Sequence, residues 1–203
     1  QEAAALLRLA TPVLKFRATR DGRKVTGDAM EMRGGIGYVE EWVNPRLVRD
    51  AHLGSIWEGT SNIVALDAVT RAVAKHDCHA PFQAALHARL DEAEGVPTDY
   101  LDELRGYVDR AVEMIGAVGA NQADEAVCRQ ATSVFYHAAT AVLMAWEGAQ
   151  THSRRGDARR LLWSRLVVDH HLKARDPYAL GDSGREDEIA AYLFGDADVP
   201  MAD

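Results

Sequence analysis

The sequence predicts an all-α protein. Apolar residues recur at helical intervals of three and four in most segments, for example at Leu101, Leu104 and Val108. In the second half of the chain the period-two alternation of a strand is absent, and glycine-rich turns are rare. The 203 residues, 47% of them hydrophobic, are enough for one sizeable core or two small ones. We therefore expect helices that pack on helices.

The first 79 residues are predicted to form several helices. Residues 3–9 resemble the end of one helix, and Thr11 and Pro12 predict a new start, with threonine as the N-cap and proline in the first turn. Asp21 and Gly22 predict a break before a helix over 24–33. Further helices are expected over 45–52 and 61–75, the latter capped by Thr60 and Ser61. Its expected core-facing residues are Ile63, Leu66, Val69 and Val73.

The remainder, 80–203, is predicted to be a separate antiparallel helix bundle with short loops. The expected helices cover 81–94, a segment from Thr98 to at least Val118, 122–150, 157–174 and 185–194. The apolar face of the 122–150 helix is broad, which favours self-association. It comprises Val127, Ala131, Val134, Phe135, Ala138, Val142, Ala145 and Trp146.

Charge and cysteine content narrow the class of protein. The net charge is −8, but residues 1–79 carry +1 and residues 80–203 carry −9. An acidic second half repels nucleic acid and anionic membranes. Cys78 and Cys128 are far apart, so a reducing, cytoplasmic location is expected. The cluster His76-Asp77-Cys78-His79 lacks a second ligand pair at a suitable distance, so no metal site is expected.

Two motifs lie between residues 34 and 63. The first is Gly34-Gly35-Ile36-Gly37-Tyr38, where the backbone can approach a ligand closely. The second is Ile56-Trp57-Glu58-Gly59-Thr60-Ser61-Asn62-Ile63, which places one carboxylate at the start of a helix. A lone glutamate beside glycine is usually a surface residue, and glycine pairs commonly end helices. The functional interpretation therefore depends on the two motifs occurring together.

The two motifs, with Asp28 to Tyr38 and Arg49-Asp50-Ala51, resemble in order and spacing the C-terminal helical domain of acyl-CoA dehydrogenases. The resemblance implies that Glu58 is the general base that takes the α-proton of an acyl-CoA thioester, while FAD takes a hydride from the β-carbon. It implies that Gly59 contacts substrate. The residues implied to contact flavin are Glu31, Gly34, Gly35, Gly37, Thr60 and Asn62. The family usually has glutamine at position 31, so Glu31 is a departure.

The resemblance also implies partners and a longer parent protein. Family members form homodimers or tetramers through this helical domain, and the glycine loop serves the flavin of a neighbouring subunit. Their electrons pass to electron-transfer flavoprotein or a similar acceptor. The N-terminal helical domain and central β-domain of the family are missing from these 203 residues, so we expect a fragment that is inactive alone. Glu40-Glu41-Trp42 and Trp57 resemble the branch that contains the alkylation-response proteins and has an extra C-terminal region.

Two alternatives remain open. The chain could be a helical oligomerisation module without catalysis, or a DNA-protecting flavoprotein of the alkylation-response type. A basic cluster, Arg154, Arg155, Arg159, Arg160 and Arg165, bears on the second alternative. Because it lies in a segment of net charge −9, we interpret it as a solvated helix face or subunit contact. Asp169-His170-His171 is interpreted as a helix surface or a buried polar contact, and Arg49 with Asp50 as an ion pair or a brace for the Glu58 loop.

Overall fold

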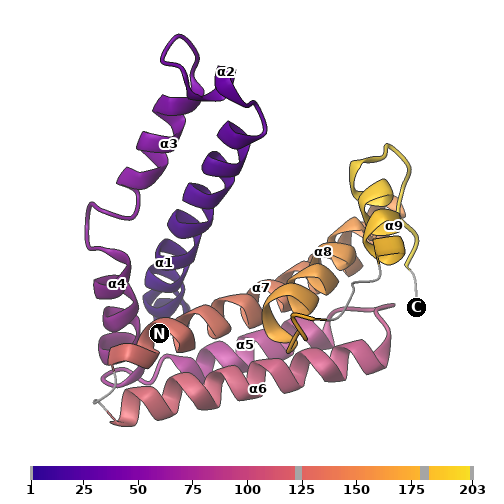
Figure 1. Ribbon diagram of the computed structural model, residues 1–203. Helices are drawn as coiled ribbons and strands as arrows, with labels where there is room; N and C mark the ends of the chain where they lie inside the picture. Colours follow the sequence, from indigo (N-terminus) through magenta and orange to yellow (C-terminus); the bar gives the residue numbers. More distant parts are fainter. Residues whose placement is uncertain (1, 122–124, 179–182, 202–203) are drawn as a thin grey trace. The chain divides into compact units, whose positions relative to one another are not determined.

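The computed structural model describes residues 2–121, 125–178 and 183–201, and every regular element within them is a helix (Figure 1). The prediction of an all-α fold is confirmed. None of the helices in this described part could cross a membrane. Backbone contacts divide the chain into two compact units, residues 1–79 with 115–133 and residues 80–114 with 134–203. A domain boundary after residue 79 stays a prediction, because the helices α6 (Thr98–Asn121) and α7 (Glu125–Arg155) contribute to both units.

The first unit is built on one long helix, α1 (Glu2–Glu31), which buries Leu9, Val13 and Phe16. The elements that follow α1 are α2 (Gly35–Tyr38), α3 (Asn44–Leu53), α4 (Ser61–Asp67) and the π-helix η1 (Ala68–Val73). Helices α3 and α4 pack against α1. The predicted helix over 45–52 is confirmed by α3.

Helix α1 is continuous, so the predicted breaks at Thr11-Pro12 and Asp21-Gly22 are wrong. Pro12 lies inside the helix, between the buried residues Leu9, Val13 and Phe16. This packing offsets the cost of the missing N–H group. Asp21 forms an i,i+4 ion pair with Arg17, at 2.5 Å, which stabilises the helical conformation across Gly22.

Helix α4 faces the core with a different side from the one that the sequence predicts. Val64 and Ala65 are buried in a cluster with Phe16 of α1, whereas Ile63 is 58% exposed. The expectation for Ile63 is therefore wrong, while Val69 and Val73 are buried as predicted. Both Ile63 and its neighbours Val64 and Ala65 are apolar, so the pattern allows two adjacent sides of α4 to face the core. The position of α1 decides which of these sides is buried.

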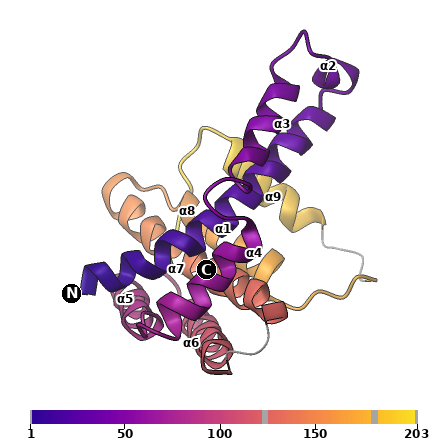
Figure 2. The ribbon, with the colours of Figure 1, turned by 90° about the vertical axis from the view of Figure 1, so that its left-hand side faces the viewer.

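The second unit contains parts of three long helices that lie side by side, α5, α6 and α7 (Figures 1 and 2). The helices after residue 78 are α5 (His79–Asp91), α6 (Thr98–Asn121), α7 (Glu125–Arg155), α8 (Arg159–Val167), the π-helix η2 (Val168–Leu172) and α9 (Ser183–Phe194). The predicted helix start at Gln122 lies outside the described residues. The other predicted helices are confirmed, with ends that shift by a few residues.

The broad apolar face of α7 is mostly buried within the chain. Phe135, Ala138, Val142 and Ala145 are buried, and Leu143 is the large apolar residue of this helix that is exposed. The expectation that this face is free for self-association is therefore wrong. Other parts of the same chain cover it.

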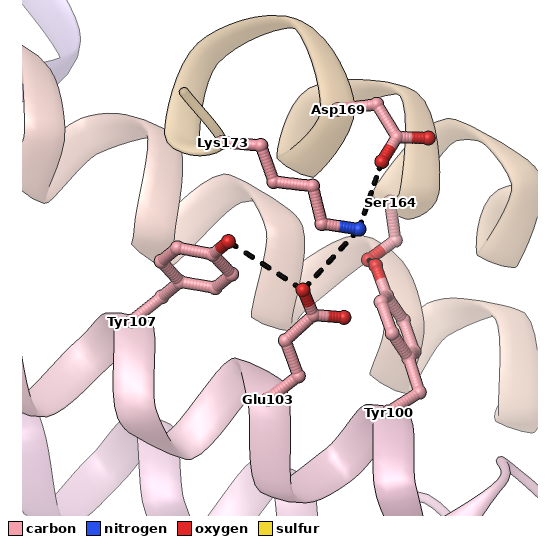
Figure 3. Close-up of polar contacts among 6 residues, drawn as sticks. All are labelled: Tyr100, Glu103, Tyr107, Ser164, Asp169 and Lys173. Atoms are coloured by element: carbon pink, nitrogen blue, oxygen red, sulfur yellow. Dashed lines mark hydrogen bonds and ion pairs between the residues drawn. The ribbon is translucent and has the colours of Figure 1, made fainter. Parts of the chain in front are cut away.

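A polar network joins α6 to α8 and η2 in the second unit (Figure 3). The Tyr100 hydroxyl and Ser164 Oγ lie 2.8 Å apart, and Ser164 Oγ also donates to the Ala141 carbonyl at 2.6 Å. Lys173 Nζ lies 3.0 Å from Asp169 and 3.3 Å from Glu103. Burial disfavours the charge on Lys173, but its hydrogen bonds to the two carboxylates outweigh that effect and raise its pKa.

We expect Tyr100→Phe to change how the stability of the protein depends on pH. Burial raises the pKa of Tyr100, because the phenolate would lose its hydration. The folded state therefore keeps a proton that the unfolded chain releases near pH 10, so this residue's contribution falls as the pH rises above about 10. Tyr100→Phe should cost about 1 kcal/mol at pH 8 and reduce the alkaline loss of stability. Urea unfolding at pH 8 and at a pH above about 10 measures both effects.

The matched control is Tyr178→Phe, since that side chain is 91% exposed. It should leave the free energy of unfolding unchanged at both pH values. If the free energy of unfolding fell with rising pH as steeply in Tyr100→Phe as in the unchanged protein, the prediction would be contradicted.

Candidate functional site

Glu58 lies in a turn of unusual backbone conformation between α3 and α4. Its φ is 52°, and the next residue, Gly59, has a φ of 99°. Left-handed conformations are uncommon for residues other than glycine. Thr60 then returns to an extended conformation as the N-cap of α4, but its side chain makes no capping hydrogen bond. The expectation that Thr60 caps through its side chain is wrong.

Lys15, from the middle of α1, holds this turn. Its ammonium group donates hydrogen bonds to three successive carbonyl oxygens, those of Trp57 at 2.8 Å, Glu58 at 2.7 Å and Gly59 at 3.2 Å. A lysine has three N–H donors, so all of them are used here. The three bonds favour the conformation in which these carbonyls converge, which offsets the strain at Glu58. Local sequence patterns do not mark Lys15 as a site residue, because its partners lie 42, 43 and 44 residues further along the chain.

The predicted brace between Arg49 and Asp50 does not form. Arg49 instead binds both carboxylate oxygens of Glu40, at 2.7 and 3.1 Å. Asp50 pairs with Arg46 at 3.5 Å. All four side chains are exposed, so these pairs contribute little to stability.

A pocket of about 450 Å³ lies beside Glu58, between α1 and α4. Its wall combines apolar groups with charged ones, and Asp67 and Arg71 neutralise each other across 3.1 Å. The lining residues are Thr11, Pro12, Lys15, Glu58, Ile63, Val64, Asp67 and Arg71. Because the Glu58 side chain is exposed, the described residues of this chain do not supply the shielding from water that strengthens a carboxylate as a base.

The glycine motif forms the short helix α2 and the turn before it. Gly34 has a φ of 58°, which favours glycine. Gly37 is buried, and a Cβ atom there would overlap the carbonyl oxygen of Met30, so α1 and α2 approach each other closely. Gly35 has open space around it. Glu31 ends α1 with an exposed side chain. This tip therefore presents backbone and one carboxylate to the outside.

The structure divides the predicted site residues into two groups. Glu58, Gly59, Thr60 and Asn62 lie together at the start of α4. Glu31 and the three glycines lie at the far tip of α1, where α2 and α3 meet in both views (Figures 1 and 2). From Lys15, which touches the Glu58 turn, to Glu31 the helix rises about 24 Å. One chain therefore does not bring the two groups to the same point.

The basic cluster of the second half makes contacts within its own unit. Arg159 donates to the carbonyls of Gly195 and Ala197, Arg160 lies 3.5 Å from Glu147, and Arg165 lies over the ring of Tyr100. His171 stacks on His137 with 4.0 Å between ring centroids. Within the described residues, no group of three or more potential ligands could hold a metal ion.

Comparison with known proteins identifies the first part of the chain. Residues 1–74 match the family model described as "Acyl-CoA dehydrogenase, C-terminal domain". This match confirms the resemblance that the two motifs carry. No solved structure matches the chain.

Individual relatives agree with this assignment. The putative acyl-CoA dehydrogenase AidB of Escherichia coli (strain K12) is 40% identical over 111 residues, 53% of this chain and 18% of that protein. Acyl-CoA dehydrogenase family member 11 of Caenorhabditis elegans is 29% identical over 176 residues, 86% of this chain and 28% of that protein. The mitochondrial short/branched chain specific acyl-CoA dehydrogenase of Bos taurus is 36% identical over 67 residues. The match covers 30% of this chain and 16% of that protein. The chain thus spans less than a third of each relative.

Proposed function

We propose that this chain is the C-terminal part of a flavin-dependent acyl-CoA dehydrogenase. In this proposal Glu58 removes the α-proton of an acyl-CoA thioester. A bound FAD would supply the acceptor for the β-hydride, and electron-transfer flavoprotein or a similar acceptor would take up the electrons. The observation that supports it best is the Glu58 turn. A carboxylate is held beside a pocket of about 450 Å³ in a strained conformation that Lys15 stabilises. Such strain is common where side-chain position matters for function.

The proposal assigns the two groups of site residues to two different flavins. Gly59, Thr60 and Asn62 would lie near the substrate and the flavin of their own subunit, next to Glu58. Glu31, Gly34, Gly35 and Gly37 would reach the flavin of a neighbour, because the tip of α1 is about 24 Å away along the helix. The carboxylate of Glu31 repels phosphate, so we assign it a contact with the uncharged part of the cofactor.

Exposed apolar side chains of the first unit support assembly with other chain segments. Met32, Tyr38 and Trp42 at the tip, and Ile56 and Trp57 before Glu58, are all more than half exposed. Large exposed apolar surfaces mark interfaces. We propose that they are covered in a homodimer or tetramer and by the domains that precede this one in the parent. That cover would also supply the shielding that Glu58 lacks here.

The DNA-protecting alternative receives less support. Three of the five arginines of the basic cluster are held by carbonyl, carboxylate or aromatic groups of the same unit, as described above. Nucleic-acid binding needs such side chains free for phosphate. A chain that served only in oligomerisation would not need the strained backbone conformation at Glu58.

The test uses the full-length parent protein. It should be yellow when purified, and anaerobic addition of acyl-CoA esters of different chain length should bleach the flavin absorbance for at least one of them. The 203-residue chain should stay colourless after dialysis against excess FAD, because one turn and one helix tip bury too little of the cofactor to offset its ordering cost. A colourless parent, or a flavin that no acyl-CoA reduces, would overturn the proposed function.

A further inference from the structure

A second pocket, of about 450 Å³, lies on the other half of α1 and shares no lining residue with the pocket at Glu58. Four cationic side chains and one carboxylate from about two turns of α1 line it, together with one histidine of α3. The lining residues are Arg17, Arg20, Asp21, Arg23, Lys24 and His52. The domain assignment gives this cluster no role.

The carboxylates around this pocket do not balance its positive charge. Asp21 pairs with Arg17 at 2.5 Å, and Asp28 pairs with Lys24 at 2.6 Å. In the described part of the chain, Arg20 and Arg23 make no ion pair. The pocket therefore contains two positive charges that have no carboxylate partner, those of Arg20 and Arg23.

Repulsion among these cations is evident at Arg20. Burial first, and then the positive charges of Arg129, Arg23 and Arg17, lower the pKa of Arg20, while Asp21 acts in the opposite direction. Arg129 belongs to the part of α7 in the same unit, so a fifth cation adds to the same field. Like charges this close destabilise the helix unless an anion compensates them.

We propose that this pocket binds a pyrophosphate-type anion. Guanidinium groups bind phosphoryl oxygens in a two-pronged geometry, and two of them here have no carboxylate partner, one for each phosphoryl group. His52 also lines the pocket, and its Nδ1 donates to the Val48 carbonyl at 2.8 Å, so this ring is held by α3 and the two arginines carry the anion contacts. The source is either free pyrophosphate or the diphosphate of a nucleotide.

Isothermal titration of the protein at constant ionic strength tests the proposal, with inorganic pyrophosphate and ADP as probes. Saturable binding is expected, and Arg20→Gln and Arg23→Gln should each weaken it at least about tenfold, the loss of one good charged contact. The control Arg46→Gln removes the same charge from an exposed site on α3 and should change the Kd less than about twofold. Tighter binding of ADP identifies a nucleotide as the ligand, and equal affinities identify the phosphoryl groups alone.

Thermal unfolding provides a second readout that a purely structural cluster would not give. Without the anion, Arg20→Gln should raise the Tm, because it relieves the repulsion. Saturating pyrophosphate should raise the Tm of the unchanged protein by about 5–10 °C and that of the variant much less. Arg23→Gln is the second variant if Arg20→Gln fails to fold. No saturable binding at millimolar pyrophosphate, or an equal loss of affinity in Arg46→Gln, would overturn the proposal.

Discussion

The Glu58→Gln variant of the full-length parent is expected to bind acyl-CoA while its flavin stays oxidised. The amide keeps the shape and hydrogen bonding of the side chain but cannot accept the α-proton. In the proposed mechanism the β-hydride would leave only as that proton is removed, so the rate of flavin reduction should fall by at least about 10²–10⁴-fold, the contribution of a general base. Stopped-flow absorbance under anaerobic conditions measures the rate directly.

Two further variants separate chemistry from structure. Glu58→Asp should retain a small activity, because the shorter side chain places the base about one methylene too far away. Glu41→Gln removes an exposed carboxylate elsewhere in the same unit and should reduce flavin at the normal rate. Near-normal flavin reduction in Glu58→Gln would refute the assignment and direct the search to a base on another helix.

The motifs of the sequence predicted the domain, and local signals predicted most helices. Asn44-Pro45 and Thr98 mark helix starts that the structure confirms. The failures concern positions where local and tertiary preferences disagree. Pro12 and Gly22 disfavour a helix locally, but α1 continues through both because its apolar residues pack on both sides of Pro12. Ile63 fits a helical stripe, yet the side of α4 that meets Phe16 carries Val64 and Ala65 instead.

The geometry of the candidate site could not be predicted from local sequence patterns. Residues 31–37 and 58–62 are close in the sequence, but α3 carries the chain back along α1 before Glu58, so the two groups lie at different positions on that helix. Lys15 is distant in sequence and meets the turn only after folding. Local patterns name the residues for which we propose the chemistry, whereas the contacts of one distant lysine decide how the turn is held.

Lys15→Met in the full-length parent is expected to lower the rate of flavin reduction strongly while acyl-CoA still binds. The methionine retains the apolar part of the side chain but leaves the carbonyls of Trp57, Glu58 and Gly59 without their shared donor. The turn should then relax from its left-handed conformation and move the Glu58 carboxylate. A displacement of about 1 Å can reduce a rate about 10²-fold. In this prediction Lys15 is a positioning residue, which acts through Glu58.

The readouts for Lys15→Met distinguish positioning from general damage. The rate constant for flavin reduction should fall, with little change in the Kd for acyl-CoA, and Lys15→Arg should recover part of the rate because a guanidinium can still donate to adjacent carbonyls. Lys75→Met removes an exposed lysine of the same unit and should reduce flavin normally. The double variant Lys15→Met/Glu58→Gln should be no slower than Glu58→Gln alone, since both changes act through one carboxylate. Additive losses in the double variant, or a normal rate in Lys15→Met, would show that Lys15 does not position the base.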